Sequence, residues 1–145
     1  MTKLLPEDNA ASMASAAQRG REAWKRGDIA GAEGAFLEAW AAIPEPRLEY
    51  DHAQSIARGL AVFFRDTNQP SKAYEWLESV RKAYKDPQNP SVAFLTGTIA
   101  FSAGNRAEAF AIFDDLHKRF GSRPFRAEDA KYLDFYKEMH AKREA

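Results

Sequence analysis

The sequence predicts an all-α fold in a single domain, residues 1–145. Composition, the spacing of turn residues and an internal repeat support this prediction. Among 145 residues, 27 are Ala, whereas only 3 are Val and 5 are Ile. Because Ala favours helices and β-branched residues favour strands, this composition strongly disfavours a β-rich fold. Ten Phe, five Tyr and three Trp supply bulk for a core between Ala-rich helices.

Turn residues divide the chain into segments of helical length. Within each segment the apolar residues recur at steps of three and four, which is the spacing of one helical face. Seven helices are therefore expected, in order, with apolar faces that run over residues 13–24, 29–43, 53–64, 73–84, 92–103 and 109–120, and with the last helix at residues 127–141. The connections are short, which favours antiparallel neighbours.

Particular residues predict where several of these helices begin. Proline lacks a backbone N–H, and this costs nothing in the first turn of a helix, so Pro46, Pro70 and Pro90 are expected there. Asn89 is placed to cap the helix that begins at Pro90. Glu128 and Asp129 are expected in the first turn of the last helix, where negative charge is favourable.

Charge and composition exclude several classes of protein. Lys and Arg number 21, as do Asp and Glu, so no global positive field is available for nucleic acid or an acidic membrane. Cys is absent, which excludes disulfides and cysteine metal sites. No apolar run reaches the ~20 residues of a membrane helix, and the N-terminus lacks a signal-peptide core. A cytoplasmic protein is therefore expected.

The sequence contains no recognisable catalytic or metal-binding motif. Its three histidines, His52, His117 and His140, are widely separated, and no nucleotide-binding or hydrolase signature occurs. Asp114 and Asp115 are adjacent and point about 100° apart on a helix, so they are interpreted as a solvated face. We expect a protein that is not an enzyme and that needs neither a metal nor another cofactor.

A helix–turn–helix pattern occurs twice and supplies the third observation. The turn glycines Gly27 and Gly104 are each preceded by a glycine seven residues earlier and followed by Ala at five and Phe at nine residues. A middle copy fits at the same offsets, with Asn68 in place of the turn glycine. The sets at these offsets are Gly20, Ala32 and Phe36; Ala61, Ala73 and Leu77; and Gly97, Ala109 and Phe113.

This pattern resembles the tetratricopeptide repeat, in which a small residue on the first helix meets a small residue and an aromatic on the second. The resemblance implies a right-handed helical solenoid of about three hairpins with a C-terminal capping helix. The spacings from Ala32 to Ala73 and from Ala73 to Ala109, 41 and 36 residues, exceed the usual ~34. The first excess predicts a lengthened helix after Pro46.

A closer resemblance covers most of the chain. The segments that carry it occur in the order Pro44-Glu45-Pro46, Asn89-Pro90, Gly97, Gly104-Asn105, Phe125, Glu128-Asp129 and Lys131-Tyr132-Leu133. They look like those of short bacterial tetratricopeptide proteins encoded beside secreted polymorphic toxins, including type VI secretion effectors. Those proteins are taken to be immunity proteins. The resemblance implies a protein that binds a cognate toxin, as in a toxin–antitoxin pair.

The repeat offsets also predict a binding face, because the first helices of stacked pairs line the concave side. The expected partner-binding residues are Arg21, Trp24, Lys25, Arg58, Val62, Arg65, Phe94, Thr98 and Phe101. The set holds cations and aromatics and no carboxylate. We expect the cations to meet acidic groups of a protein partner and the aromatics to act as anchors, since Arg and Trp dominate binding hot spots.

Several alternative interpretations of these residues are open. The aromatics of the set could belong to the core, and Arg58 and Arg65 could pair with Asp51 or Asp66. The last helix could cover the end of the solenoid or contact the partner through Tyr132, Phe135 and Tyr136. A toxin with a basic cleft would need an acidic surface, around Asp114, Asp115 and Asp134.

The rival function is that of a tetratricopeptide-type secretion chaperone or adaptor, which grips an extended segment of an effector. The third possibility is a structural scaffold in a homo-oligomer. We expect a monomer or weak homodimer when the protein is free, with no nucleic-acid or membrane partner.

Overall fold

The computed structural model describes residues 4–144 and divides the chain into two compact units, Met1–Lys85 and Asp86–Ala145. Within the described residues the secondary structure is helical and contains no strand, which confirms the all-α fold class. Each unit has its own apolar core. The prediction of a single domain stays a prediction.

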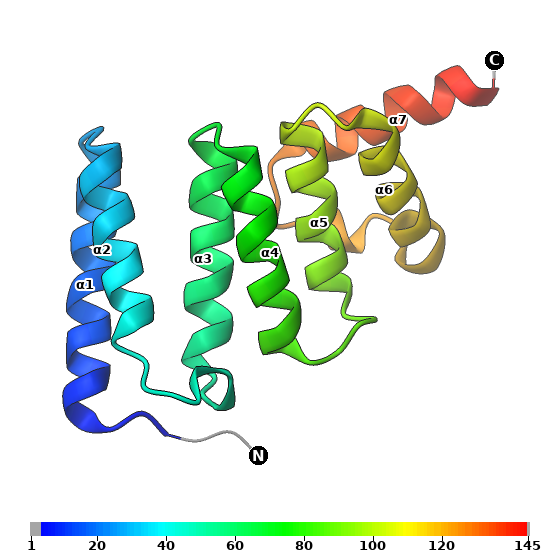
Figure 1. Cartoon of the computed structure of the whole chain (residues 1–145). Helices are drawn as coiled ribbons and strands as arrows, with labels where there is room; N and C mark the ends of the chain where they lie inside the picture. The colour runs from blue at the N-terminus through cyan, green and yellow to red at the C-terminus, as the bar shows by residue number, and fades with distance from the viewer. Residues whose placement is uncertain (1–3, 145) are drawn as a thin grey trace. The chain divides into compact units, whose positions relative to one another are not determined.

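The first unit contains two antiparallel helix pairs (Figure 1). Helix α1 (Glu7–Lys25) packs along α2 (Ile29–Ala41), and α3 (His52–Asp66) packs along α4 (Pro70–Tyr84). Helix α2 also contacts α3, which joins the two pairs. Small side chains allow this close packing, because seven alanines of the first unit are completely buried: Ala16, Ala32, Ala39, Ala53, Ala57, Ala61 and Ala73.

The second unit contains a third helix pair and one further helix. Helix α5 (Pro90–Ser102) packs along α6 (Arg106–Phe120), and α7 (Ala130–Glu144) follows the short 3₁₀ helix η2 (Arg123–Phe125). The core of this unit is aromatic. Its buried rings belong to Phe94, Phe110, Phe113, Phe125, Tyr132, Phe135 and Tyr136.

The predicted contact between a small residue and an aromatic is confirmed in the first and third helix pairs. A Cβ atom built on Gly20 would lie 2.6 Å from the ring of Phe36, and one built on Gly97 would lie 2.5 Å from the ring of Phe113. Both rings therefore occupy the space that a side chain would need. The same register recurs in the two units.

The turns between paired helices also share one backbone conformation. Gly27 and Gly104 have φ of 85° and 86°, and Asn68, at the same position of the middle pair, has φ of 58°. Glycine adopts this left-handed region without strain, and Asn is among the few other residues that tolerate it. The middle pair therefore has the same kind of turn as the other two pairs, although its sequence lacks the turn glycine.

Two predicted helix starts are confirmed, and the third is wrong. Helices α4 and α5 begin at Pro70 and Pro90, and the Asn89 side chain accepts hydrogen bonds from the backbone N–H groups of Ser91 (2.8 Å) and Val92 (3.2 Å). Pro46 instead precedes the 3₁₀ helix η1 (Arg47–Glu49), and α3 begins only at His52. The extra residues after Pro46 therefore form η1 and do not lengthen α3.

The last helix begins at Ala130, three residues later than predicted. Phe125 inserts into the core of the second unit as part of η2, and this delays the helix. Asp129 lies before α7, where its side chain accepts a hydrogen bond from the backbone N–H of Lys131 at 3.0 Å. Its role is that of a cap and not of a first-turn charge.

The aromatic residues of α7 face the core of the second unit. Tyr132, Phe135 and Tyr136 are buried, and Tyr132 and Phe135 lie within 6.4 Å of the ring of Phe113, measured between ring centroids. Side chains buried in this way cannot also provide a contact surface. The structure therefore favours a core-covering role for α7 over direct partner contact through these three residues.

Candidate functional site

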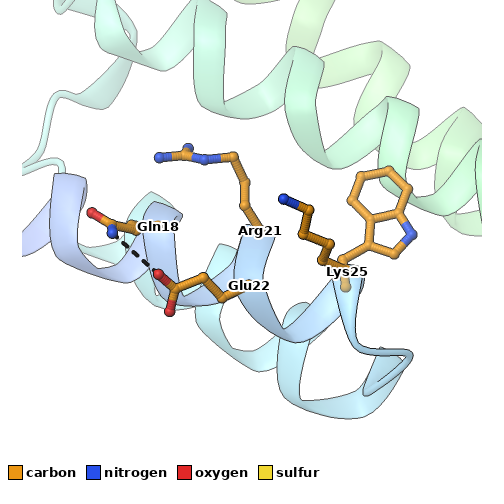
Figure 2. A pocket seen from close by; sticks show the side chains of 5 residues that line it. Gln18, Arg21, Glu22 and Lys25 are labelled. Carbon is orange, nitrogen blue, oxygen red and sulfur yellow. Dashed lines mark hydrogen bonds between the residues drawn. The ribbon is translucent and has the colours of Figure 1, made fainter.

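A hollow of about 670 Å³ opens beside the C-terminal half of α1. Its described lining residues all belong to that helix: Gln18, Arg21, Glu22, Trp24 and Lys25. Figure 2 shows Arg21 and Lys25 extending to the same side of the helix, while Glu22 bends back toward Gln18. Three of the predicted partner-binding residues, Arg21, Trp24 and Lys25, are therefore brought together at one hollow.

Trp24 connects the hollow to the core of the first unit. Its ring meets Phe63 of α3 and Phe36 of α2 edge-to-face, with centroid distances of 5.0 and 6.3 Å. The side chain is half-buried, so one part of it packs and another part reaches the surface. Such a held aromatic loses little conformational freedom when a partner covers it. Trp24 can therefore pack against the core and also serve as an anchor for a partner.

Gln18 and Glu22 were missed by the sequence-based prediction. The Gln18 side-chain amide donates a hydrogen bond to Glu22 Oε1 at 3.1 Å. The signal that could have identified them is their spacing, because side chains four residues apart on a helix are neighbours. This hydrogen bond holds the Glu22 carboxylate toward Gln18.

The predicted residues on α3 differ in character from those on α1. The Arg65 side chain is only 12% exposed, and its guanidinium donates to both carboxylate oxygens of Asp66, at 2.7 and 3.1 Å. The alternative that pairs Arg65 with Asp66 is therefore confirmed. Arg58 and Val62 are half-buried on the same helix. Because its charge is already matched, Arg65 is a poor candidate for attracting a partner's carboxylate.

Two residues predicted on the second unit are corrected by the structure. Phe94 is 3% exposed and packs against Phe113 and Phe125 at centroid distances of 5.3 and 5.1 Å. Thr98 is completely buried, and its hydroxyl donates to the Leu95 carbonyl at 2.7 Å. Neither side chain can form a contact surface, since both are enclosed. The helix is apolar all round, so periodicity could not reveal this.

Phe101 occupies an intermediate position. It is partly exposed, and its ring packs against Tyr132 and Phe135 of α7 at 5.6 and 5.0 Å. The structure therefore places it at the edge of the aromatic core of the second unit.

Asp114 does not lie on a freely solvated face, contrary to the prediction. Its carboxylate accepts a hydrogen bond from the Tyr136 hydroxyl at 2.8 Å and pairs with Lys118 Nζ at 2.9 Å. The side chain is 19% exposed. The hydrogen bond from Lys118 lowers the pKa of Asp114 most, and that from Tyr136 lowers it further, while burial opposes both. Asp114 thus joins α6 to α7.

This contact predicts a particular response to acid. A carboxyl group with a lowered pKa in the folded state contributes stability above its unfolded pKa of about 4, and loses it as the pH falls through the folded pKa. We expect Asp114→Asn to cost about 1 kcal/mol at pH 7 and progressively less below pH 4. Urea unfolding from pH 7 to pH 2 measures this. Asp115→Asn, beside an exposed Arg119, is the control, and parallel profiles for all three proteins would contradict the assignment.

Across residues 4–144, no group of three His, Asp or Glu side chains gathers as a metal site would require. In the same part of the chain, no helix has both the length and the apolar character needed to cross a membrane.

Comparisons with protein-family models, with curated proteins and with solved structures find no match to this chain.

Proposed function

We propose that the chain is a tetratricopeptide-like helical repeat protein that binds another protein through the hollow beside α1, without catalysing a reaction. Its function is that of a cytoplasmic immunity protein, which neutralises a cognate secreted bacterial toxin by direct complex formation. The fold part of the proposal is supported by the Gly20–Phe36 and Gly97–Phe113 contacts, which recur at the same register. The C-terminal segment 125–133 resembles that of tetratricopeptide proteins encoded beside secreted toxins, and this resemblance supports a toxin as the partner.

The observation that carries the binding proposal is the arrangement around Trp24. Its ring is held edge-to-face by two Phe rings, and it lines the same hollow as two exposed cations. Aromatic and Arg residues placed together on a surface are typical of binding hot spots.

Co-expression with the product of the neighbouring toxin gene tests the proposed function. We expect cells to survive when both proteins are produced at matched levels, and a stable complex to be recovered by gel filtration. Cell death that continues at matched expression would reject the immunity function.

The same complex separates immunity from the chaperone alternative. An immunity protein should bind the folded toxin domain far more tightly than any short unstructured peptide derived from it. A peptide that binds as tightly as the whole partner would favour a secretion chaperone or adaptor. Light scattering of the free protein tests the alternative of a homo-oligomeric scaffold. A monomer mass that does not change with protein concentration would contradict that alternative.

A further inference from the structure

The aromatic residue of the hollow beside α1 is held by rings from two other helices. The plane of the Trp24 ring makes an angle of 87° with the ring of Phe36 on α2 and also with that of Phe63 on α3. Phe36 and Phe63 contact each other as well, with ring centroids 5.3 Å apart. Three helices of the first unit therefore each contribute one ring to a closed triangle.

The two phenylalanines of this triangle are positioned in different ways. Phe36 fills the space beside Gly20, so its place is set by the packing of α1 against α2 within the first helix pair. Phe63 belongs to the second helix pair and is completely buried. It is also the nearer of the two to Trp24, at 5.0 Å between centroids compared with 6.3 Å for Phe36. Phe63 is thus the residue through which the second helix pair reaches the hollow.

Phe63 is itself held on its other side. The ring of Phe64 lies 5.2 Å from that of Phe63, and Lys72 Nζ of α4 lies 5.4 Å from the centroid of the Phe64 ring. Lys72 also pairs with Glu33 of α2 at 3.2 Å. Close-packed side chains of this kind are restricted to one rotamer. A ring that cannot move restricts in turn the ring that packs against it.

We propose that Phe63 is a positioning residue of the hollow, which holds Trp24 in the orientation that a protein partner contacts. This inference rests on the proposed function. Because Phe63 is completely buried, it acts on a partner through Trp24 and not by direct contact. Ordering a free side chain when a complex forms weakens binding by a factor of about 2 to 13. Phe63 removes this penalty by ordering Trp24 before the partner arrives.

Calorimetry on the full chain, with the product of the neighbouring toxin gene as the ligand, tests the effect on affinity. Phe63→Leu keeps an apolar side chain but removes the ring, and we expect it to bind about three- to tenfold more weakly. The matched control is Phe64→Leu, which removes a ring of equal size at the next position of α3 and should bind within about twofold of the unmodified protein. Phe64 is 1% exposed, so both substitutions affect the core. Binding is measured at a temperature at which circular dichroism shows every variant to be folded.

A double-mutant cycle tests whether Phe63 acts through Trp24. In the Trp24→Ala background, adding Phe63→Leu should change the affinity by less than about twofold, because the side chain that Phe63 positions is absent. Equal losses of affinity with and without Trp24 would contradict a positioning role.

Fluorescence tests the orientation of Trp24 without any partner. The chain has three tryptophans, and the other two, Trp40 and Trp76, contact each other at 5.1 Å between ring centroids. Replacing both by Phe leaves Trp24 as the sole tryptophan. In this background Phe63→Leu should lower the fluorescence anisotropy of Trp24 and increase its quenching by acrylamide, whereas Phe64→Leu should change neither.

The outcomes distinguish failure of this inference from failure of the proposed function. If the unmodified protein does not bind the product of the neighbouring gene, the proposed function fails and the positioning role in binding fails with it. If it binds, but Phe63→Leu and Phe64→Leu weaken binding alike or leave the fluorescence of Trp24 unchanged, the positioning role alone is overturned. Should Phe63→Leu not fold, Phe63→Met takes its place in the same comparisons, because the flexible Met side chain fills irregular gaps in a core.

Discussion

Replacing Gly97 by Leu is expected to destabilise the protein by about 2–3 kcal/mol, because the new side chain has no space. Even a Cβ atom at this position would lie 2.5 Å from Phe113, whose ring is completely buried. The Phe113 ring is rigid and surrounded by other rings, so it cannot move aside without displacing α6 from α5. Thermal unfolding followed by circular dichroism measures the effect.

The matched control for this substitution is Gly59→Leu. Gly59 lies in α3, and a Cβ atom built there would meet nothing within 4 Å. Because Leu favours the helix by about 0.8 kcal/mol over Gly, this variant should be as stable as the unmodified protein or more so. Equal melting temperatures for Gly97→Leu and the unmodified protein would show that the assigned repeat register is wrong.

Replacing Phe113 by Ala is expected to have the largest effect of all, about 3–5 kcal/mol. Its ring is 0% exposed and contacts Phe94, Phe125 and Tyr132 at centroid distances of 5.3, 5.4 and 6.0 Å. Removing it leaves a cavity that these rigid rings cannot fill. The second unit has only 60 residues, so a loss of this size should remove much of its stability, as hydrogen exchange of residues 86–145 would report.

Phe120 provides the control on the same helix. It is 38% exposed, and its Ala variant should cost less than about 1 kcal/mol. A further test combines the two sites: in the Phe113→Ala background, Gly97→Leu should cost much less than it does alone, because the atoms that it would strike are gone. Strictly additive effects would contradict the direct contact between positions 97 and 113.

Features that depend on short spacings in the chain were predictable from the sequence. Helix positions follow from apolar residues at steps of three and four, and the helix start at Pro70 and the cap at Asn89 depend only on their immediate neighbours. The Gly97–Phe113 contact was predictable because the same offsets recur at Gly20 and Phe36. A pattern that repeats along the chain shows which positions of different helix pairs are equivalent, so it carries information about packing.

The candidate site was predicted only in part, for a physical reason. Arg21, Trp24 and Lys25 lie within five residues of one helix, so their shared face follows from helical geometry. Whether a predicted residue is available to a partner depends on segments distant in the chain, or on a local ion pair that competes with solvent. Phe94 is enclosed by rings from α6, η2 and α7, and Arg65 is matched by its neighbour Asp66.

The amino-acid sequence by itself determined the helices, their antiparallel pairing and the small-residue positions where paired helices approach, because these depend on local backbone preferences and on periodicity. Only the tertiary structure decided which cations are paired with a carboxylate from another helix and which aromatics are enclosed. The ion pair of Arg19 with Glu38, and the difference between Trp24 and Phe94, depend on the atoms that packing brings beside them, and helix α1 or α5 taken alone does not contain those atoms.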